Sequence, residues 1–208
     1  IVSMYARGMS TREITGHFDP RVYRFATTVL PYGLSGLMQG FSPAGLFHEI
    51  RGASRLDDHL LLEGEVKGLQ RLVERGTVIL APTHSSNLDS LLIGYAIFRM
   101  GLPPFVYGAG LNLFTNPLTS FFMHNLGAYT VDRSKTDPLY RETLKEYATV
   151  TMEAGQHNLF FPGGTRSRSG EIESRVKLGL LGAGLAAYRN NLLRGKESRE
   201  RVFVVPCT

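Results

Sequence analysis

A histidine followed five residues later by an aspartate is the arrangement in this chain that most directly suggests catalysis. His84 and Asp89 lie in the run Thr-His-Ser-Ser-Asn-Leu-Asp, which follows an apolar, β-branched segment. With His84 on a loop and Asp89 in the first turn of a following helix, the carboxylate can accept a hydrogen bond from one ring nitrogen. That bond selects the tautomer and leaves the other nitrogen free as a general base, a role worth roughly 10²–10⁴ in rate. A capped helix N-terminus would also explain Asp89, but it gives His84 no role.

A second candidate site is the run Phe-Phe-Pro-Gly-Gly-Thr-Arg-Ser-Arg-Ser-Gly at residues 160–170, which also follows a strand-like segment. Paired glycines let backbone amides approach a ligand closely, and two arginines with three hydroxyl groups suit a phosphate. The run lacks the Gly-Lys-Ser/Thr ending of a nucleotide P-loop. A solvated basic turn is the alternative interpretation.

Arg133 is a third candidate, because it directly follows the strand-like residues 128–131. An arginine at that position can pair with the phosphate of a substrate. The alternative is a surface ion pair with Asp132 or Asp137.

These motifs need elements that bring them together, and the chain alternates between helical and strand-like segments. Periodicity and turn residues predict helices over 66–74, 88–100, 117–125, 138–154 and 177–193. They predict strands over 77–80, 105–107, 128–131, 158–161 and 202–205. The alternation indicates an α/β fold with a mostly parallel central sheet flanked by helices. Ligands in such sheets bind beyond the carboxyl ends of the strands, where each motif lies.

The N-terminal part of the chain precedes this alternation of helices and strands and includes an apolar segment. We therefore predict a separate helical, membrane-facing segment over residues 1–55, ahead of a domain over 56–208. Residues 25–47 are apolar but rich in Gly and Ser, and Pro31 and Pro43 interrupt them. We expect two short helices lying on or dipping into a membrane, and not a spanning helix, with helices packed on a core as the alternative. The chain starts without a methionine and stops just after an apolar run, so we expect both ends to be cut.

The order of the motifs is more specific than any one of them. A His-four-residues-Asp block precedes a Gly-x-x-x-x-x-Arg block, a Phe-Pro-x-Gly-Thr-Arg-Ser-Arg block and a closing Val-Val-Pro block. Over residues 60–208 the chain resembles the glycerolipid acyltransferase family, which acylates glycerol 3-phosphate, dihydroxyacetone phosphate or lysophosphatidate.

The resemblance implies a role for each block. His84 would deprotonate the acceptor hydroxyl for attack on an acyl thioester, of coenzyme A or a carrier protein, and Asp89 would orient it. The acceptor phosphate would be bound by Arg133 and Arg166, in a pocket shaped by Gly164, Thr165 and Ser167. Lys177 would belong to the same substrate-binding set and, with the preceding Ser-Arg-Ser-Gly run, favours the glycerol-3-phosphate branch. Val205 and Pro206 would line the acyl side, and no cofactor would be needed beyond the thioester.

One residue departs from the family pattern. Gly163 stands where the family usually has a glutamate. The departure admits, as an alternative, a catalytically altered relative that binds lipid.

Composition favours anionic partners, since Lys and Arg exceed Asp and Glu by 23 − 18 = 5 and the pI is about 9.5. With the apolar N-terminal segment, this excess predicts association with the cytoplasmic face of a membrane. One cysteine, Cys207, excludes a disulfide framework, and the histidines lack the spacing of metal ligands.

Two rival functions find little support. Residues 4–14 resemble part of a helix-turn-helix, but the rest of the chain does not read as a nucleic-acid-binding protein. Residues 182–187 nearly match a dinucleotide fingerprint. No β-branched strand precedes them, so we interpret them as a small-residue helix packed tightly on the sheet.

Overall fold

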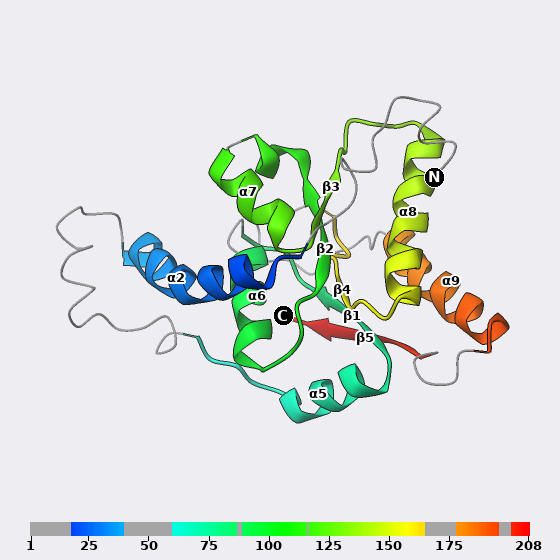
Figure 1. Ribbon diagram of the computed structural model, residues 1–208, viewed down its shortest axis with the longest axis horizontal. Helices are drawn as coiled ribbons and strands as arrows, with labels where there is room; N and C mark the ends of the chain where they lie inside the picture. Colours follow the sequence, from blue (N-terminus) through cyan, green and yellow to red (C-terminus); the bar gives the residue numbers. More distant parts are fainter. Residues whose placement is uncertain (1–17, 40–59, 87–88, 116, 165–177, 196–200) are drawn as a thin grey trace.

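A five-stranded sheet forms the centre of the molecule (Figure 1). The computed structural model describes residues 18–39, 60–86, 89–115, 117–164, 178–195 and 201–208. Its strands are β1 (Thr77–Pro82), β2 (Val106–Gly110), β3 (Ala128–Val131), β4 (Asn158–Leu159) and β5 (Val202–Cys207). They lie in the order β3-β2-β4-β1-β5, and every neighbouring pair is parallel. The predicted α/β fold with a parallel sheet is confirmed.

Helices cover both faces of this sheet. On one face α5 (Val66–Arg75) and α6 (Asp89–Arg99) pack on a core that includes Val78, Leu80 and Leu159. On the other face α8 (Pro138–Glu153) and α9 (Gly179–Leu193) pack on a core around Ile79 and Phe160. The first face continues into α7 (Pro117–Asn125), the 3₁₀ turn η2 (Leu111–Phe114) and α2 (Pro20–Gln39).

The sequence of the interior strand β1 explains why the strand is buried on both faces. It pairs with β5 from Thr77 opposite Val202 to Pro82 opposite Cys207, and with β4 on its other side. Val78 and Ile79 are fully buried on opposite faces. A strand covered on both faces needs a continuous apolar run, which the sequence Thr-Val-Ile-Leu-Ala-Pro supplies.

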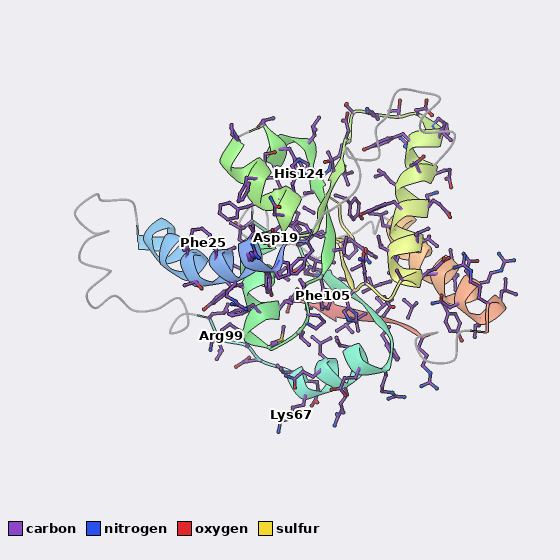
Figure 2. The ribbon with its side chains drawn as sticks, in the orientation of Figure 1. Asp19, Phe25, Lys67, Arg99, Phe105 and His124 are labelled. Carbon is purple, nitrogen blue, oxygen red and sulfur yellow. The ribbon has the colours of Figure 1, made fainter. Side chains whose placement is uncertain are left out.

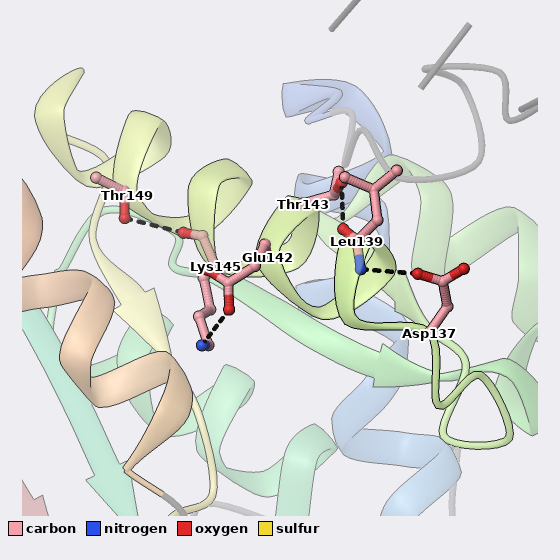
Figure 3. Close-up of polar contacts among 6 residues, drawn as sticks. All are labelled: Asp137, Leu139, Glu142, Thr143, Lys145 and Thr149. Atoms are coloured by element: carbon pink, nitrogen blue, oxygen red, sulfur yellow. Dashed lines mark hydrogen bonds and ion pairs between the residues drawn. The ribbon is translucent and has the colours of Figure 1, made fainter. Parts of the chain in front are cut away.

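The residues around position 137 explain where α8, the helix between β3 and β4, begins. The Asp137 carboxylate accepts a hydrogen bond from the backbone N–H of Leu139, and Pro138 occupies the first turn, where no backbone donor is needed. Figure 3 shows this cap together with the pair between Lys145 and Glu142. The helix begins at the predicted residue and ends within one residue of the predicted end.

The predicted break at Pro31 is wrong, while residues 40–47 of the same predicted segment, with Pro43, lie outside the described residues. The helix α2 continues without a break from Pro20 to Gln39, capped by the Asp19 carboxylate at 2.8 Å from the Arg21 N–H. An interior proline removes one backbone hydrogen bond and costs about 3 kcal/mol, but it does not forbid a helix. Packing against α6 and α7 offsets this cost. In the described parts of the chain, no helix combines the length and hydrophobicity that crossing a bilayer requires.

Other predictions for the N-terminal part lie outside the described residues. These are the helical segment before residue 18, the helix-turn-helix resemblance at 4–14, and the proposed boundary between residues 55 and 56.

The small residues of α9 lie against the sheet. Ala183, Gly184 and Ala187 are buried, and a Cβ atom added at Gly184 would overlap the Cδ1 of Ile79. A Cβ at Gly182, on the same helix, would meet no atom within 4 Å. The glycine at 184 therefore serves close packing of helix on sheet, as the sequence indicated.

These two glycines make a matched pair of tests. We expect Gly184→Ala to lower the free energy of unfolding by about 1–3 kcal/mol, because Ile79 is fully buried and has little room to move. Gly182→Ala should raise it by up to about 1 kcal/mol, because alanine favours a helix over glycine. Urea unfolding of both variants checks the pair, and equal effects would contradict the packing argument.

Candidate functional site

The predicted site residues follow strands of one parallel sheet, so they gather at one edge of it. His84 follows β1, Arg133 follows β3, and the turn that contains Gly164 follows β4. Carboxyl ends of parallel strands point the same way, and this edge is where open α/β sheets bind ligands. Thr165, Arg166, Ser167 and Lys177 lie outside the described residues.

His84 and Asp89 are in contact. The Nδ1 atom of His84 lies 2.9 Å from Oδ2 of Asp89, and the two side chains are 14% and 17% exposed. The same carboxylate oxygen accepts hydrogen bonds from the backbone N–H groups of Ser85 at 2.6 Å and Ser86 at 2.8 Å. Three donors therefore converge on one carboxylate at the start of α6.

These donors determine the charge of Asp89. Burial by itself would raise the pKa of this carboxyl group, but the N–H of Ser86, the ring of His84 and the N–H of Ser85 together hold the pKa below its ordinary value. Asp89 is then ionised at neutral pH and can only accept hydrogen bonds. It follows that Nδ1 of His84 carries the proton in this contact, and that Nε2 of the neutral ring has a free lone pair.

The loop after β4 supplies a contact that the sequence analysis missed. The ring of Phe161 stacks on the ring of His84, with centroids 4.1 Å apart and planes inclined by 25°. The backbone turns back directly after Phe161, whose carbonyl accepts a hydrogen bond from the N–H of Gly164 at 3.0 Å. Gly164 has a φ of 68°, a conformation that favours glycine. The resemblance had pointed to the polar residues of this run, and aromatic stacking has no sequence signal of its own.

Arg133 lies at the same edge but farther along it. Two strands, β2 and β4, separate β3 from β1, which corresponds to about 14 Å between the chain segments that carry Arg133 and His84. The side chain of Arg133 is exposed. The neighbouring Asp132 carboxylate accepts from the N–H and the hydroxyl of Ser134, at 2.9 and 2.6 Å, and these bonds lower its pKa. The segment is thus held as a tight turn.

Val205 and Pro206 lie on β5, next to β1. Val205 packs against the core formed by Val78 and Leu80, opposite the register position of Leu80, and Pro206 is exposed. Neither residue is among those that line the cavity described next.

An apolar cavity of about 310 Å³ extends from α6 between the sheet and the helices α2 and α7. Ser90, the residue after Asp89, is part of the cavity wall, so α6 carries both Asp89 and residues that line the cavity. Figure 2 shows Phe105, one of the lining residues, in the middle of the molecule. The surrounding wall includes Tyr23, Leu91, Gly94, Phe105, Tyr107 and Leu159. Its size is that of a small-molecule site, and its lining suits a hydrocarbon.

The lowered pKa of Asp89 gives a test of this geometry through stability. A carboxyl group whose pKa is lower in the folded chain adds stability above its unfolded pKa of about 4, and this contribution disappears as the pH falls through the folded value. We expect Asp89→Asn to cost about 1–2 kcal/mol at pH 7 and progressively less towards about pH 2.

Urea unfolding between pH 7 and about pH 2 measures the difference. Glu146→Gln, at an exposed position of α8, is the control and should change little. A cost of Asp89→Asn that did not depend on pH would contradict the ionised, triply bonded carboxylate.

Comparison with known proteins shows what this chain is similar to. A solved structure, the 1-acyl-sn-glycerophosphate (LPA) acyltransferase PlsC from Thermotoga maritima, is similar with a TM-score of 0.40 and 18% identity, over 80% of this chain and 67% of that chain. A glycerol-3-phosphate acyltransferase of Aeromonas hydrophila subsp. hydrophila is 29% identical over 184 residues, 88% of this chain and 20% of that protein. One of Pseudomonas fluorescens is 33% identical over 142 residues, 68% of this chain and 16% of that protein.

The chain therefore spans a fifth or less of the length of these curated relatives. The family model described as Acyltransferase matches residues 63–208, which include His84, Asp89 and every strand of the described sheet. The chain belongs to the acyltransferase family, as the order of its motifs predicted.

Proposed function

We propose that this domain transfers a fatty acyl group from an acyl thioester to the hydroxyl group of glycerol 3-phosphate or a related phosphorylated acceptor. The observation that carries the proposal is the contact between His84 and Asp89, next in the chain to Ser90, which lines an apolar cavity. The names of the curated relatives support this acceptor class.

His84 acts as the general base in this proposal. Its Nε2 takes the proton from the acceptor hydroxyl, and the oxygen attacks the thioester carbonyl. When the tetrahedral intermediate collapses, the C–S bond breaks and the thiolate leaves with the proton that His84 gained. Asp89 holds the ring in the required tautomer and stabilises its protonated form. No acyl-enzyme or cofactor is needed, because the thioester is already activated.

The acceptor phosphate is bound by basic side chains at the same sheet edge. We assign this role to Arg133 and Arg166, with Gly164, Thr165, Ser167 and Lys177 shaping the pocket. The turn at Gly164 supports it, because a glycine at φ 68° lets the backbone approach an anion closely. We also assign Val205 and Pro206 to the acyl side of the site; on β5 they pair with Leu80 and Ala81 of β1, and they lie outside the wall of the apolar cavity.

The apolar cavity holds the acyl chain. It lies on the sheet face that carries Leu80 and Leu159, and α6 connects it directly to Asp89. An acyl chain bound there is removed from water at a gain of about 0.8 kcal/mol per methylene group.

We also propose that the domain works at the cytoplasmic surface of a membrane. Phe25 and Phe121 are 56% and 52% exposed on α2 and α7, and Phe25 stacks on Phe122 across the two helices. Figure 2 shows Phe25 on α2. Arg21 and Arg24 are exposed on the same helix. Exposed aromatic rings beside arginines suit the interface of an anionic bilayer, and the cavity wall includes α2 residues.

The base is tested first. We expect His84→Ala to reduce thiol release from a long-chain acyl-CoA, measured with glycerol 3-phosphate in the full chain, by about 10²–10⁴-fold. His124→Ala, at an exposed histidine of α7, is the matched control and should leave the rate unchanged.

Two other outcomes of the thiol-release experiment would contradict the proposal in different ways. Release that ignores the acceptor would indicate a thioesterase or another acceptor. If the folded wild type shows no turnover with either coenzyme A or carrier-protein thioesters, the proposal falls and a lipid-binding relative replaces it.

The cavity is tested through Gly94 of α6, where an added Cβ would meet no atom within 4 Å. We expect Gly94→Leu to fill part of the cavity and to raise the KM for long-chain donors by tenfold or more, at about fourfold per displaced methylene group. Short-chain donors should be little affected. Gly94→Ala is the control for the backbone change, and equal losses for all donor lengths would show that the acyl chain lies elsewhere.

A further inference from the structure

The imidazole ring of His84 is held from two directions. At its edge, Nδ1 bonds the Asp89 carboxylate at 2.9 Å, and on its face the ring of Phe161 lies at 4.1 Å. A hydrogen bond at one ring atom still leaves the plane of an imidazole free to swing. A ring stacked on its face removes that freedom, because the swing would drive the two rings into each other.

Phe161 itself has little room to move away. The N–H of the preceding Phe160 donates to the carbonyl of Leu80 at 3.1 Å, which ties the segment to β1. On the other side, the carbonyl of Phe161 accepts from Gly164, and Pro162 fixes φ inside this turn. The backbone is therefore anchored on both sides of Phe161. The bond before it is to β1, the strand that leads to His84, and the bond after it closes the turn to Gly164.

We infer that Phe161 is a positioning residue of the acyl transfer, which acts by holding the ring plane of His84. The inference rests on the proposed role of His84 as the base. It assigns to the β4 loop a function besides binding the acceptor.

The neighbouring phenylalanine offers a matched control. Phe160 is 7% exposed and packs with Ile79 and Met152 in the core on the face of the sheet that is opposite to the apolar cavity. A Leu substitution at 160 should mainly lower stability, whereas one at 161 should mainly change the reaction. The pair separates positioning from a purely structural role.

The test compares Phe161→Leu, Phe161→Tyr and Phe160→Leu by acceptor-dependent thiol release in the full chain. We expect Phe161→Leu to lower kcat by about 10- to 100-fold, with the KM values for donor and acceptor nearly unchanged. Phe161→Tyr retains a stacking ring and should restore kcat, and Phe160→Leu should leave kcat and both KM values as in the wild type.

Wild-type kcat in a folded Phe161→Leu variant would overturn the inference, while the loss of activity in His84→Ala would keep the proposed function intact. Equal effects of Phe160→Leu and Phe161→Leu on kcat, or a failure of Phe161→Tyr to restore it, would reduce Phe161 to a structural role. If His84→Ala retained full activity, the proposed function would fail and the inference with it.

Discussion

The parallel pairing of β1 with β4 is the contact on which the rest of the site depends. Ile79 lies opposite Asn158 and Leu80 opposite Leu159, and the bond from Phe160 to the Leu80 carbonyl extends the ladder. His84 and Phe161 leave these two strands side by side, so their rings meet. A slip of one residue would turn one of the rings to the opposite face, since side chains alternate along a strand.

The helix α6 joins the polar and apolar parts of the site. Its first residue, Asp89, carries the charge that orients His84, and its next residues, Ser90 and Leu91, already belong to the cavity wall. The carboxylate is satisfied by three donors and can remain ionised next to an apolar space. The single helix α6 therefore links Asp89, the partner of His84, to the wall of the apolar cavity.

The local features of this arrangement were predictable from the sequence, and the contacts between distant segments were not. The spacing of His84 and Asp89 indicated their bond, and Pro138 with its preceding aspartate indicated the start of α8. Periodicity and turn residues predicted strands such as β3, because those signals are local. The stacking of Phe161 and the cavity depend on strand order, which no local signal carries. The predicted break at Pro31 was wrong because the packing of α2 against α6 and α7 stabilises the helix by more than the missing backbone hydrogen bond costs.

The position of β1 in the sheet has a consequence for how the chain acquires its structure. Its two neighbours are β4 and β5, and Thr77 meets Val202 only after more than a hundred further residues have been made. Pairings so distant in the chain form late and slowly. During synthesis, β1, whose side chains at 78–80 are buried in the folded chain, therefore lacks one of its two neighbours until β5 emerges from the ribosome. Nascent chains should be most vulnerable to aggregation in that interval and most dependent on chaperones.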